Sequence, residues 1–117
     1  MFFAISATSG PTDPTKAELP FIFAASALQA GDKVMVMLFH DAVHMATIDT
    51  SNKIIPFGPP KRFDEIIEND GAEVYVCGPC VDVRHIPHTS IREKVKIGGM
   101  NDFHMAASRT DSRVVGF

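Results

Sequence analysis

Apolar residues along the chain gather in short continuous runs that alternate with stretches of helical spacing. A continuous apolar run of roughly four to eight residues is typical of a strand buried on both faces. Such runs, with two shorter ones near the C-terminus, predict strands at Phe2–Ala7, Lys33–Phe39, Glu73–Val76, Val95–Ile97 and Arg113–Phe117. Glycine, proline and polar residues separate the runs, so each strand is expected to end in a turn or a helix.

The longest stretch of helical spacing follows the first strand. Its apolar residues on one face are Ala17, Phe21, Ala24, Ala25 and Leu28. Asp13 followed by Pro14 is typical of an N-cap and a first helical residue, and Gly31 is placed to end the helix. Pro20 removes one hydrogen bond from the helix interior, so a kink or a late start is expected.

Weaker helical patterns connect the remaining strands. Helices or helical turns are predicted at Ala42–Ala46, at Lys61–Asp70 before Gly71, from Cys77 to Arg84, and after Asn101 as an N-cap, with a long loop at Thr47–Pro60. Strands that alternate with helices favour a parallel sheet, because parallel neighbours need crossover connections. We therefore expect one α/β domain over residues 1–117, with helices on both faces of the sheet.

Composition and charge narrow the classes of function. Hydrophobic residues make up 45% of the 117 residues and charged residues 21%, which is typical of a globular protein and not of a disordered or fibrous one. A net charge of −3 supplies no general attraction to nucleic acid, so no nucleic-acid partner is expected. No apolar run approaches the roughly 18 residues that cross a bilayer, so no membrane partner is expected and a cytoplasmic location is predicted.

The two cysteines of the chain lie close together, as Cys77-Gly78-Pro79-Cys80, directly after a predicted strand. Ligands and chemistry collect at the carboxyl ends of strands in open parallel sheets, so this pair lies where a functional site is expected. Pro79 suits the first turn of a helix. A helix N-terminus lowers the pKa of a nearby thiol from its usual value of roughly 8.5, which favours the reactive thiolate at Cys77.

Four interpretations of this pair are open. Cys77 accepts sulfane sulfur as a persulfide, the two thiols cycle between dithiol and disulfide, the pair binds a metal with histidines, or both cysteines pack as small apolar side chains. Thioredoxin shares the Cys-Gly-Pro-Cys motif, but there the motif follows an early strand and a tryptophan. Here Val76 precedes the motif and the chain has no tryptophan, so a thioredoxin fold is not favoured.

The metal interpretation needs ligands beyond the two thiols. His40 and His44 are four residues apart and would share one face of a helix. Their spacing relative to the cysteines matches no standard zinc motif. Neither a metal nor another cofactor is therefore expected.

Further candidates for the site follow the strands at the same edge. Arg84 supplies positive charge that favours a thiolate, or else pairs with a carboxylate. His85 is a candidate for moving protons or stabilising the thiolate, and His40 and Asp41 are supporting candidates at the end of the second strand. The residues predicted to contact an anionic substrate such as thiosulfate are Thr8, Ser9, Gly10 and Gly78.

The segment Val74–Ile86 carries a recognisable pattern. It is a strand followed by Cys-x-x-Cys, one residue, Asp, one residue, Arg, and then His85 and Ile86. With the segments Ala4–Gly10, Leu38–Val43 and Asp111–Phe117, the chain resembles the DsrE/DsrF-like sulfur-transfer family, which includes TusD-type relay subunits and YchN-type small proteins. That family commonly has glycine where this chain has His85.

The resemblance implies a three-layer α/β/α fold with a five-stranded, mainly parallel sheet, and assembly into a homotrimer or homohexamer. It also implies that Cys77 carries a persulfide, whereas relay subunits have a small residue in the place of Cys80. Leu19, Ile22 and Phe23 make the other faces of the first helix apolar, so this helix is expected to be either deeply buried or covered by another subunit.

The leading hypothesis is a sulfur carrier of the sulfurtransferase class. Cys77 accepts sulfane sulfur from a donor protein or a small sulfur compound and relays it to a partner thiol, and Cys80 resolves or shares that sulfur. Two alternatives stay open: a non-catalytic oligomeric binding module, and a Cys77/Cys80 dithiol–disulfide redox protein.

Overall fold

A computed structural model describes residues 1–51 and 61–117 of the chain. Within these ranges it contains a five-stranded sheet in the order β4-β3-β2-β1-β5, and every neighbouring pair of strands is parallel. The strands are β1 (Phe2–Ala7), β2 (Lys33–Leu38), β3 (Ala72–Cys77), β4 (Lys96–Gly98) and β5 (Ser112–Gly116). The predicted α/β class with a parallel five-stranded sheet is confirmed.

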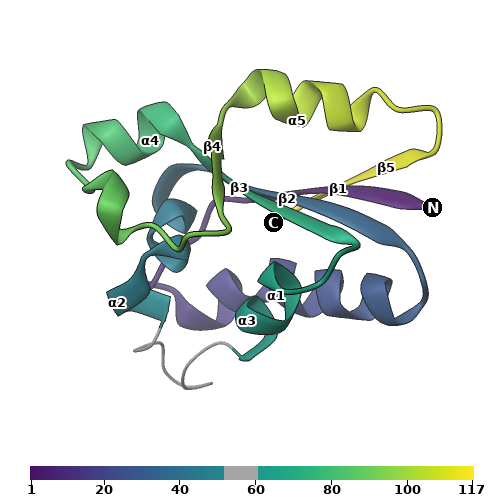
Figure 1. Cartoon of the computed structure of the whole chain (residues 1–117), viewed down its shortest axis with the longest axis horizontal. Coiled ribbons are helices and arrows are strands. Elements are labelled where there is room, and N and C mark those ends of the chain that lie inside the picture. Colours follow the sequence, from purple (N-terminus) through teal and green to yellow (C-terminus); the bar gives the residue numbers. More distant parts are fainter. Residues whose placement is uncertain (52–60) are drawn as a thin grey trace.

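Helices cover both faces of this sheet, as Figure 1 shows: α1 and α3 pack on one face and α5 on the other. The helical segments are α1 (Pro14–Gln29), the 3₁₀ helix η1 (His40–Ala46), α2 (Ile48–Ser51), α3 (Lys61–Ile67), α4 (Gly78–Val83), the 3₁₀ turn η2 (His88–Ser90) and α5 (Met100–Ala107). The predicted loop at Thr47–Pro60 instead contains α2 at its start, and its remaining residues lie outside the described ranges. None of the helices within these ranges has the length and apolar character needed to cross a membrane.

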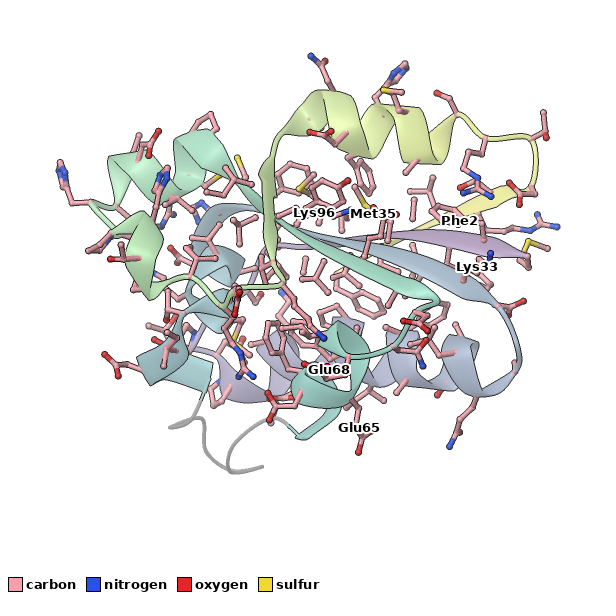
Figure 2. The ribbon with its side chains drawn as sticks, in the orientation of Figure 1. Phe2, Lys33, Met35, Glu65, Glu68 and Lys96 are labelled. Atoms are coloured by element: carbon pink, nitrogen blue, oxygen red, sulfur yellow. The ribbon has the colours of Figure 1, made fainter. Side chains whose placement is uncertain are left out.

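Alternate residues of the central strands supply a core on each face of the sheet. Ile5 and Ala7 belong to a large apolar cluster on the side of α1 and α3, whereas Phe2 and Ala4 belong to a smaller cluster with Ala106 of α5. Figure 2 shows Phe2 and Met35 between the sheet and α5. Burial on both faces explains why β1 and β2 are near-continuous apolar runs.

Helix α1 begins where its sequence signals predict. The Asp13 carboxylate accepts a hydrogen bond from the N–H of Lys16 at 3.4 Å, and Pro14 is the first helical residue. Pro20 is buried within the helix, so the predicted late start does not occur. Gly31 has a φ of +89°, a left-handed conformation that glycine adopts without steric cost and that lets the chain turn back toward β2.

Helix α5 begins earlier than the sequence pattern predicts, and Asn101 is not its N-cap. The cap is Gly99, and Met100 is the first helical residue. The Asp102 carboxylate accepts a hydrogen bond from the N–H of Gly99 at 2.8 Å. A carboxylate at the third helical position therefore satisfies the helix start, which is half of the usual capping box, and the side chain of Asn101 is not needed.

The strand register brings distant parts of the sequence together at one edge. Ala7 of β1 pairs with Leu38 of β2, and Leu38 pairs with Val76 of β3. Because the three strands are parallel and in this register, the residues that follow them meet at the same end of the sheet. There β2 continues into η1 at His40, and β3 continues into α4 at Gly78.

Candidate functional site

The two cysteines lie at the junction between β3 and α4. Cys77 is the last residue of the strand and the N-cap of the helix, and Cys80 lies one helical turn further on. The Sγ of Cys80 donates a hydrogen bond to the Sγ of Cys77 across 2.8 Å, and both are free thiols. Cys77 is 8% exposed and Cys80 is half-buried, so the pair has an inner and an outer member.

Gly78 makes this junction compact. A Cβ atom at Gly78 would lie 3.3 Å from Cγ2 of Ile97 and 3.5 Å from the carbonyl oxygen of Gly98. The first residue of α4 therefore sits against β4, in a space that fits a side chain only if the Ile97 side chain shifts by a few tenths of an ångström. Pro79 follows in the first turn, where the lack of an N–H costs nothing.

The pKa of the Cys77 thiol is raised, whereas the sequence pattern predicted that a helix N-terminus would lower it. Burial raises this pKa, the side-chain interaction with Cys80 adds to the rise because it favours the protonated Cys77 thiol, and a backbone hydrogen bond from Cys80 and the charge of Arg84 act in the opposite direction. The predicted lowering by a helix N-terminus does not prevail, because α4 has only six residues and the sulfur lies in an apolar core. At neutral pH Cys77 is therefore held mainly as the neutral thiol.

Cys80 receives a hydrogen bond from a different segment. The backbone N–H of His40, at the start of η1, points at the Sγ of Cys80 across 3.2 Å. His40 has a φ of +54°, in the left-handed region that residues other than glycine rarely adopt. The sequence pattern did not predict this contact. The direction of the His40 N–H depends on the positive φ of this residue, and the His40-Asp41 sequence by itself does not indicate a positive φ.

Arg84 connects α4 to η1 through hydrogen bonds of its guanidinium group. Its Nε and Nη2 donate to Oδ1 of Asp41 at 3.0 and 2.8 Å, and its Nη1 donates to the carbonyl oxygen of Cys80 at 3.1 Å. Its Nη2 also lies 3.1 Å from Nδ1 of His40. A guanidinium only donates, so Nδ1 of His40 is the accepting nitrogen and the proton of the neutral ring is on Nε2.

The arrangement thus joins five of the sequence-predicted candidates, namely Cys77, Cys80, Arg84, His40 and Asp41. The carboxylate that pairs with Arg84 comes from η1, which follows β2, and its hydrogen bonds from Arg84 hold the pKa of Asp41 below its usual range. Since Arg84 contacts both η1 and the backbone of α4, it fixes the distance between His40 and Cys80.

Acidification is expected to destabilise the protein in part through Asp41. The folded-state pKa of Asp41 lies below 3.8, so the unfolded chain binds this proton more readily. The contribution of the pair to stability is therefore complete above about pH 4 and is lost as the pH falls through the folded-state pKa. We expect Asp41→Asn to have a lower free energy of unfolding than the wild type at neutral pH, with the difference shrinking toward about pH 2. Urea unfolding at both pH values checks this, and a difference that does not change with pH would contradict it.

His85 lies at the far end of α4 and not beside the sulfur atoms. Its N–H donates to the carbonyl oxygen of Asp82 at 3.0 Å, and the N–H of Ile86 donates to that of Val81 at 3.2 Å. These two bonds, with a φ of +54° at His85, form a Schellman motif, the helix ending that favours glycine. A glycine at this position would adopt the left-handed conformation without steric cost.

Replacing His85 by glycine is expected to stabilise the protein. A side chain in the left-handed region costs about 1–2 kcal/mol, and the extra freedom of glycine in the unfolded chain offsets about 0.5–1 kcal/mol of that gain. His104→Gly is the matched control, because His104 is exposed inside α5 and the change should cost roughly 0.3–0.5 kcal/mol there. Thermal or urea unfolding measures both, and a loss of stability in His85→Gly as large as in His104→Gly would sink the interpretation.

The predicted anion-binding loop lies partly against η1 and partly against Phe117. Gly10 is buried against η1, where a Cβ atom would lie 2.4 Å from the carbonyl oxygen of Asp41. Thr8 faces the chain end instead, because both its N–H and its Oγ1 donate to the carbonyl oxygen of Phe117, at 3.1 and 3.0 Å. Anion binding by Thr8, Ser9 and Gly10 stays a prediction, with the N–H of Thr8 already engaged within the chain.

The remaining histidines do not gather at the sulfur atoms. His40 and His44 belong to a 3₁₀ helix, in which residues three apart and not four apart share a face. His88 lies 3.1 Å from the Asp82 carboxylate, on the outer side of α4. Among the residues that the structure describes, no group of three His, Cys, Asp or Glu side chains is placed to hold a metal ion.

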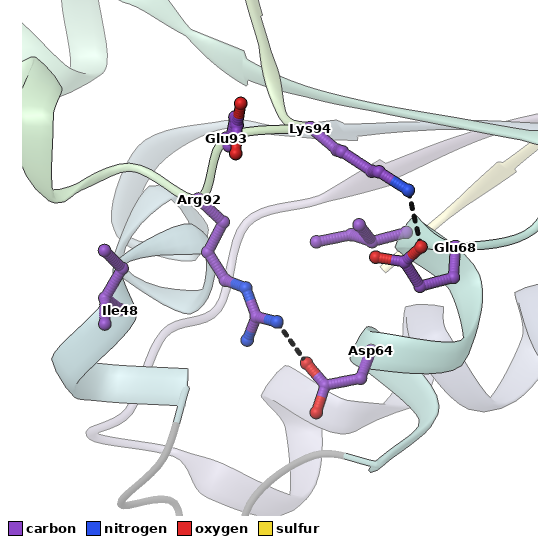
Figure 3. Close-up of a pocket in the computed structure, with 7 residues that line it drawn as sticks. Ile48, Asp64, Glu68, Arg92, Glu93 and Lys94 are labelled. Carbon is purple, nitrogen blue, oxygen red and sulfur yellow. Dashed lines mark hydrogen bonds and ion pairs between the residues drawn. The ribbon is translucent and has the colours of Figure 1, made fainter.

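A hollow lies away from the cysteines, between α3 and the segment that leads into β4 (Figure 3). Its volume is about 410 Å³, and its lining is Ile48, Asp64, Ile67, Glu68, Arg92, Glu93 and Lys94. Arg92 pairs with Asp64 at 2.6 Å, and Lys94 pairs with Glu68 at 2.5 Å. Its lining has no cysteine and no histidine, so this hollow offers no nucleophile for sulfur chemistry.

Sequence comparison finds relatives over nearly the whole chain. The sequence model of the DsrE/DsrF-like family matches residues 1–116. The uncharacterized protein MJ0989 of Methanocaldococcus jannaschii is 27% identical over 117 residues, which cover 97% of this chain and 98% of the relative. The uncharacterized protein MK0008 of Methanopyrus kandleri is 28% identical over 98 residues, which cover 81% of this chain and 77% of the relative.

Solved structures share the fold. The crystal structure of the YchN protein from E. coli superposes with a TM-score of 0.79 at 20% identity, covering 99% of this chain and 97% of that one. The structure of MTH1491 from Methanobacterium thermoautotrophicum, a protein of unknown function, superposes with a TM-score of 0.68 at 13% identity, covering 99% and 96%. At these identities the likeness establishes the common architecture.

Proposed function

This chain belongs to the DsrE/DsrF-like family, whose context is sulfur relay, and we propose that it is a sulfur carrier that holds sulfane sulfur as a persulfide on Cys77. The observation that carries the proposal is the position of Cys77, a free thiol at the carboxyl end of the strand β3, with a second thiol 2.8 Å away. Chemistry in open parallel sheets collects at this end.

The proposed transfer is an exchange between sulfur atoms. Cys77 loses its proton, and its thiolate attacks the outer sulfur of a donor persulfide. A bond forms between Cys77 and that sulfur, the sulfur–sulfur bond of the donor breaks, and the donor leaves as a thiol carrying the proton. A partner thiol then attacks the outer sulfur and regenerates Cys77. Because burial raises the pKa of Cys77, loading should become faster as the pH rises above neutrality.

The neighbouring residues have supporting functions in this proposal. Arg84 and Asp41 hold η1 against α4, and His40 places its backbone N–H on Cys80. Gly78 keeps α4 close to β4 and Gly10 keeps its loop close to η1, since a Cβ atom at either glycine would crowd the neighbouring segment. Small sulfur anions such as thiosulfate would enter from the half-buried side at Cys80.

Partners are proposed from the apolar surface near the pair. Val83 is 71% exposed, and Ile97 and Met100 are also exposed, on α4, on β4 and at the start of α5. We propose that a donor or acceptor protein, or a second subunit of a homotrimer or homohexamer, contacts these side chains. A reducing cytoplasmic compartment suits the chemistry, because thiols stay free there.

The test is a loading experiment on the reduced protein. After incubation with polysulfide or thiosulfate and removal of the excess, intact-mass spectrometry should show a gain of one sulfur atom. Peptide mapping after alkylation should place that atom on Cys77. No gain in either the wild type or Cys80→Ser at any pH between about 7 and 9, the range in which thiols ionise, together with no release of sulfide, would refute the proposal.

The dithiol–disulfide alternative has its own supporting observation, the 2.8 Å between the two sulfur atoms. A redox protein would form the Cys77–Cys80 disulfide with a general oxidant, and after polysulfide treatment and desalting it would neither carry added sulfur nor release sulfide. The binding-module alternative predicts thiols that alkylate only at pH values above about 8.5, with neither sulfur gain nor disulfide formation.

A further inference from the structure

We propose that Cys80 discharges sulfur from Cys77 within the same chain: its thiolate attacks Sγ of the Cys77 persulfide, sulfide leaves, and a Cys77–Cys80 disulfide remains. This inference rests on the proposed function and decides what the second cysteine does. It makes the loaded protein a source of sulfide when no partner thiol takes the sulfur first.

The first argument is the distance between the two sulfur atoms. They lie 2.8 Å apart, on residues three positions apart at the start of α4, where side chains one turn apart share a face. The attacking sulfur is therefore already against the atom it must reach. An attack within one chain needs no encounter with a second molecule, so it competes well with partner thiols at ordinary concentrations.

The second argument is the surroundings of Cys80. The backbone N–H of His40 points at its sulfur across 3.2 Å, and a donor in this position stabilises negative charge on the attacking atom. Arg84 keeps this donor in place by holding Asp41, the residue after His40, and the carbonyl oxygen of Cys80 at the same time. Cys77 has no comparable donor from η1 among the described contacts.

The oxidation and the reduction in this step balance among the sulfur atoms of the loaded chain. Cys80 gives up its proton and attacks the inner sulfur, the bond between Cys77 Sγ and the outer sulfur breaks, and the outer sulfur leaves as HS⁻. The two cysteine sulfurs are oxidised by two electrons in total, and the sulfane sulfur is reduced by the same two. No external oxidant or reductant enters this step.

Resetting the chain requires a reductant of the dithiol class. Such a dithiol attacks the disulfide, forms a mixed disulfide with one cysteine, and leaves in its own oxidised form. Cys80 is the more exposed member, so the mixed disulfide should form on Cys80 with Cys77 as the departing thiolate. A reaction that delivers sulfane sulfur must therefore precede this protein, and a dithiol reductant must follow it.

The test measures sulfide from loaded protein without any added thiol. Reduced wild-type chain is loaded with limiting polysulfide and desalted, and released sulfide and intact mass are then followed together. The expected result is about one sulfide per loaded chain, a final mass lower than the reduced chain by two hydrogen atoms, and a Cys77–Cys80 disulfide in the non-reducing peptide map. The rate should not depend on protein concentration.

Cys80→Ser is the matched variant. It should load one sulfur atom and keep it, with sulfide release slower than in the wild type by roughly tenfold or more. Equal lifetimes of the persulfide in the two proteins would overturn the inference while leaving the proposed function intact, and so would finding the sulfur on Cys80 of the wild type. If neither protein gains sulfur or releases sulfide, the proposed function fails instead. If Cys80→Ser folds poorly, sulfide release from the desalted wild-type chain in step with appearance of the Cys77–Cys80 disulfide decides the matter.

Discussion

Cys77→Ser is expected to abolish sulfur loading completely. The nucleophile in sulfur exchange is a thiolate, and the serine hydroxyl stays protonated and forms no stable bond to sulfane sulfur. The oxygen occupies nearly the same place as the sulfur at the end of β3, so the backbone of the junction should be kept. Intact-mass spectrometry after polysulfide treatment should show no gain of sulfur in this variant.

Cys80→Ser provides the comparison for this result, because it leaves Cys77 free to load. The Cys77 position is buried, so a hydroxyl there costs about 1–3 kcal/mol of stability unless it finds a partner. Circular dichroism and thermal unfolding must therefore show that Cys77→Ser is folded at the temperature of loading. A folded Cys77→Ser chain that gains sulfur as readily as the wild type would show that Cys77 is not the carrier.

Phe21→Ala is expected to have the largest effect on stability. Phe21 of α1 is fully buried, and its ring meets that of Phe63 of α3 edge-on, with centroids 5.0 Å apart. Truncating a buried phenylalanine costs about 3–5 kcal/mol, from lost apolar burial and from the cavity left behind. A domain of this size has about 5–15 kcal/mol of total stability, so the variant should unfold at a much lower urea concentration.

Leu19→Ala is the control for this prediction. Leu19 belongs to the same helix but is 44% exposed, so its truncation should change the free energy of unfolding by only about 0.5–1 kcal/mol. Urea unfolding of the three proteins at one temperature gives both differences. If Leu19→Ala lowers the free energy of unfolding as much as Phe21→Ala does, then the contact between Phe21 of α1 and Phe63 of α3 is not the main source of stability on this face of the sheet.

The order of the elements could be predicted from local patterns. The two buried strands at Phe2–Ala7 and Lys33–Leu38 are near-continuous apolar runs because helices cover them on both sides. The start of α1 follows from Asp13 and Pro14, which act within one helical turn. The start of α5 was predicted wrongly, because the carboxylate of Asp102 reaches back to Gly99 and a helix start can be satisfied from either side.

The sequence predicted which residues form the candidate site better than it predicted their chemical properties. Cys77 and Cys80 follow a strand, and strand ends are where parallel sheets place their functional groups. Arg84 was expected near the sulfur or near a carboxylate, and it contacts the Cys80 backbone and Asp41 together. The pKa direction of Cys77 was not predictable, because it depends on how deeply the sulfur is buried.

Local sequence patterns settle which residues form strands and helices here, and they place the cysteine pair at a strand end, because both depend on neighbours within a few positions. The contact between His40 and Cys80 is of another kind. It joins residues 40 positions apart, and it exists because β2 and β3 are adjacent and in register and because Arg84 holds η1 against α4. Contacts between distant residues follow from the packing of the whole sheet, and it is packing that makes Cys77 the buried member of the pair and Cys80 the half-buried one.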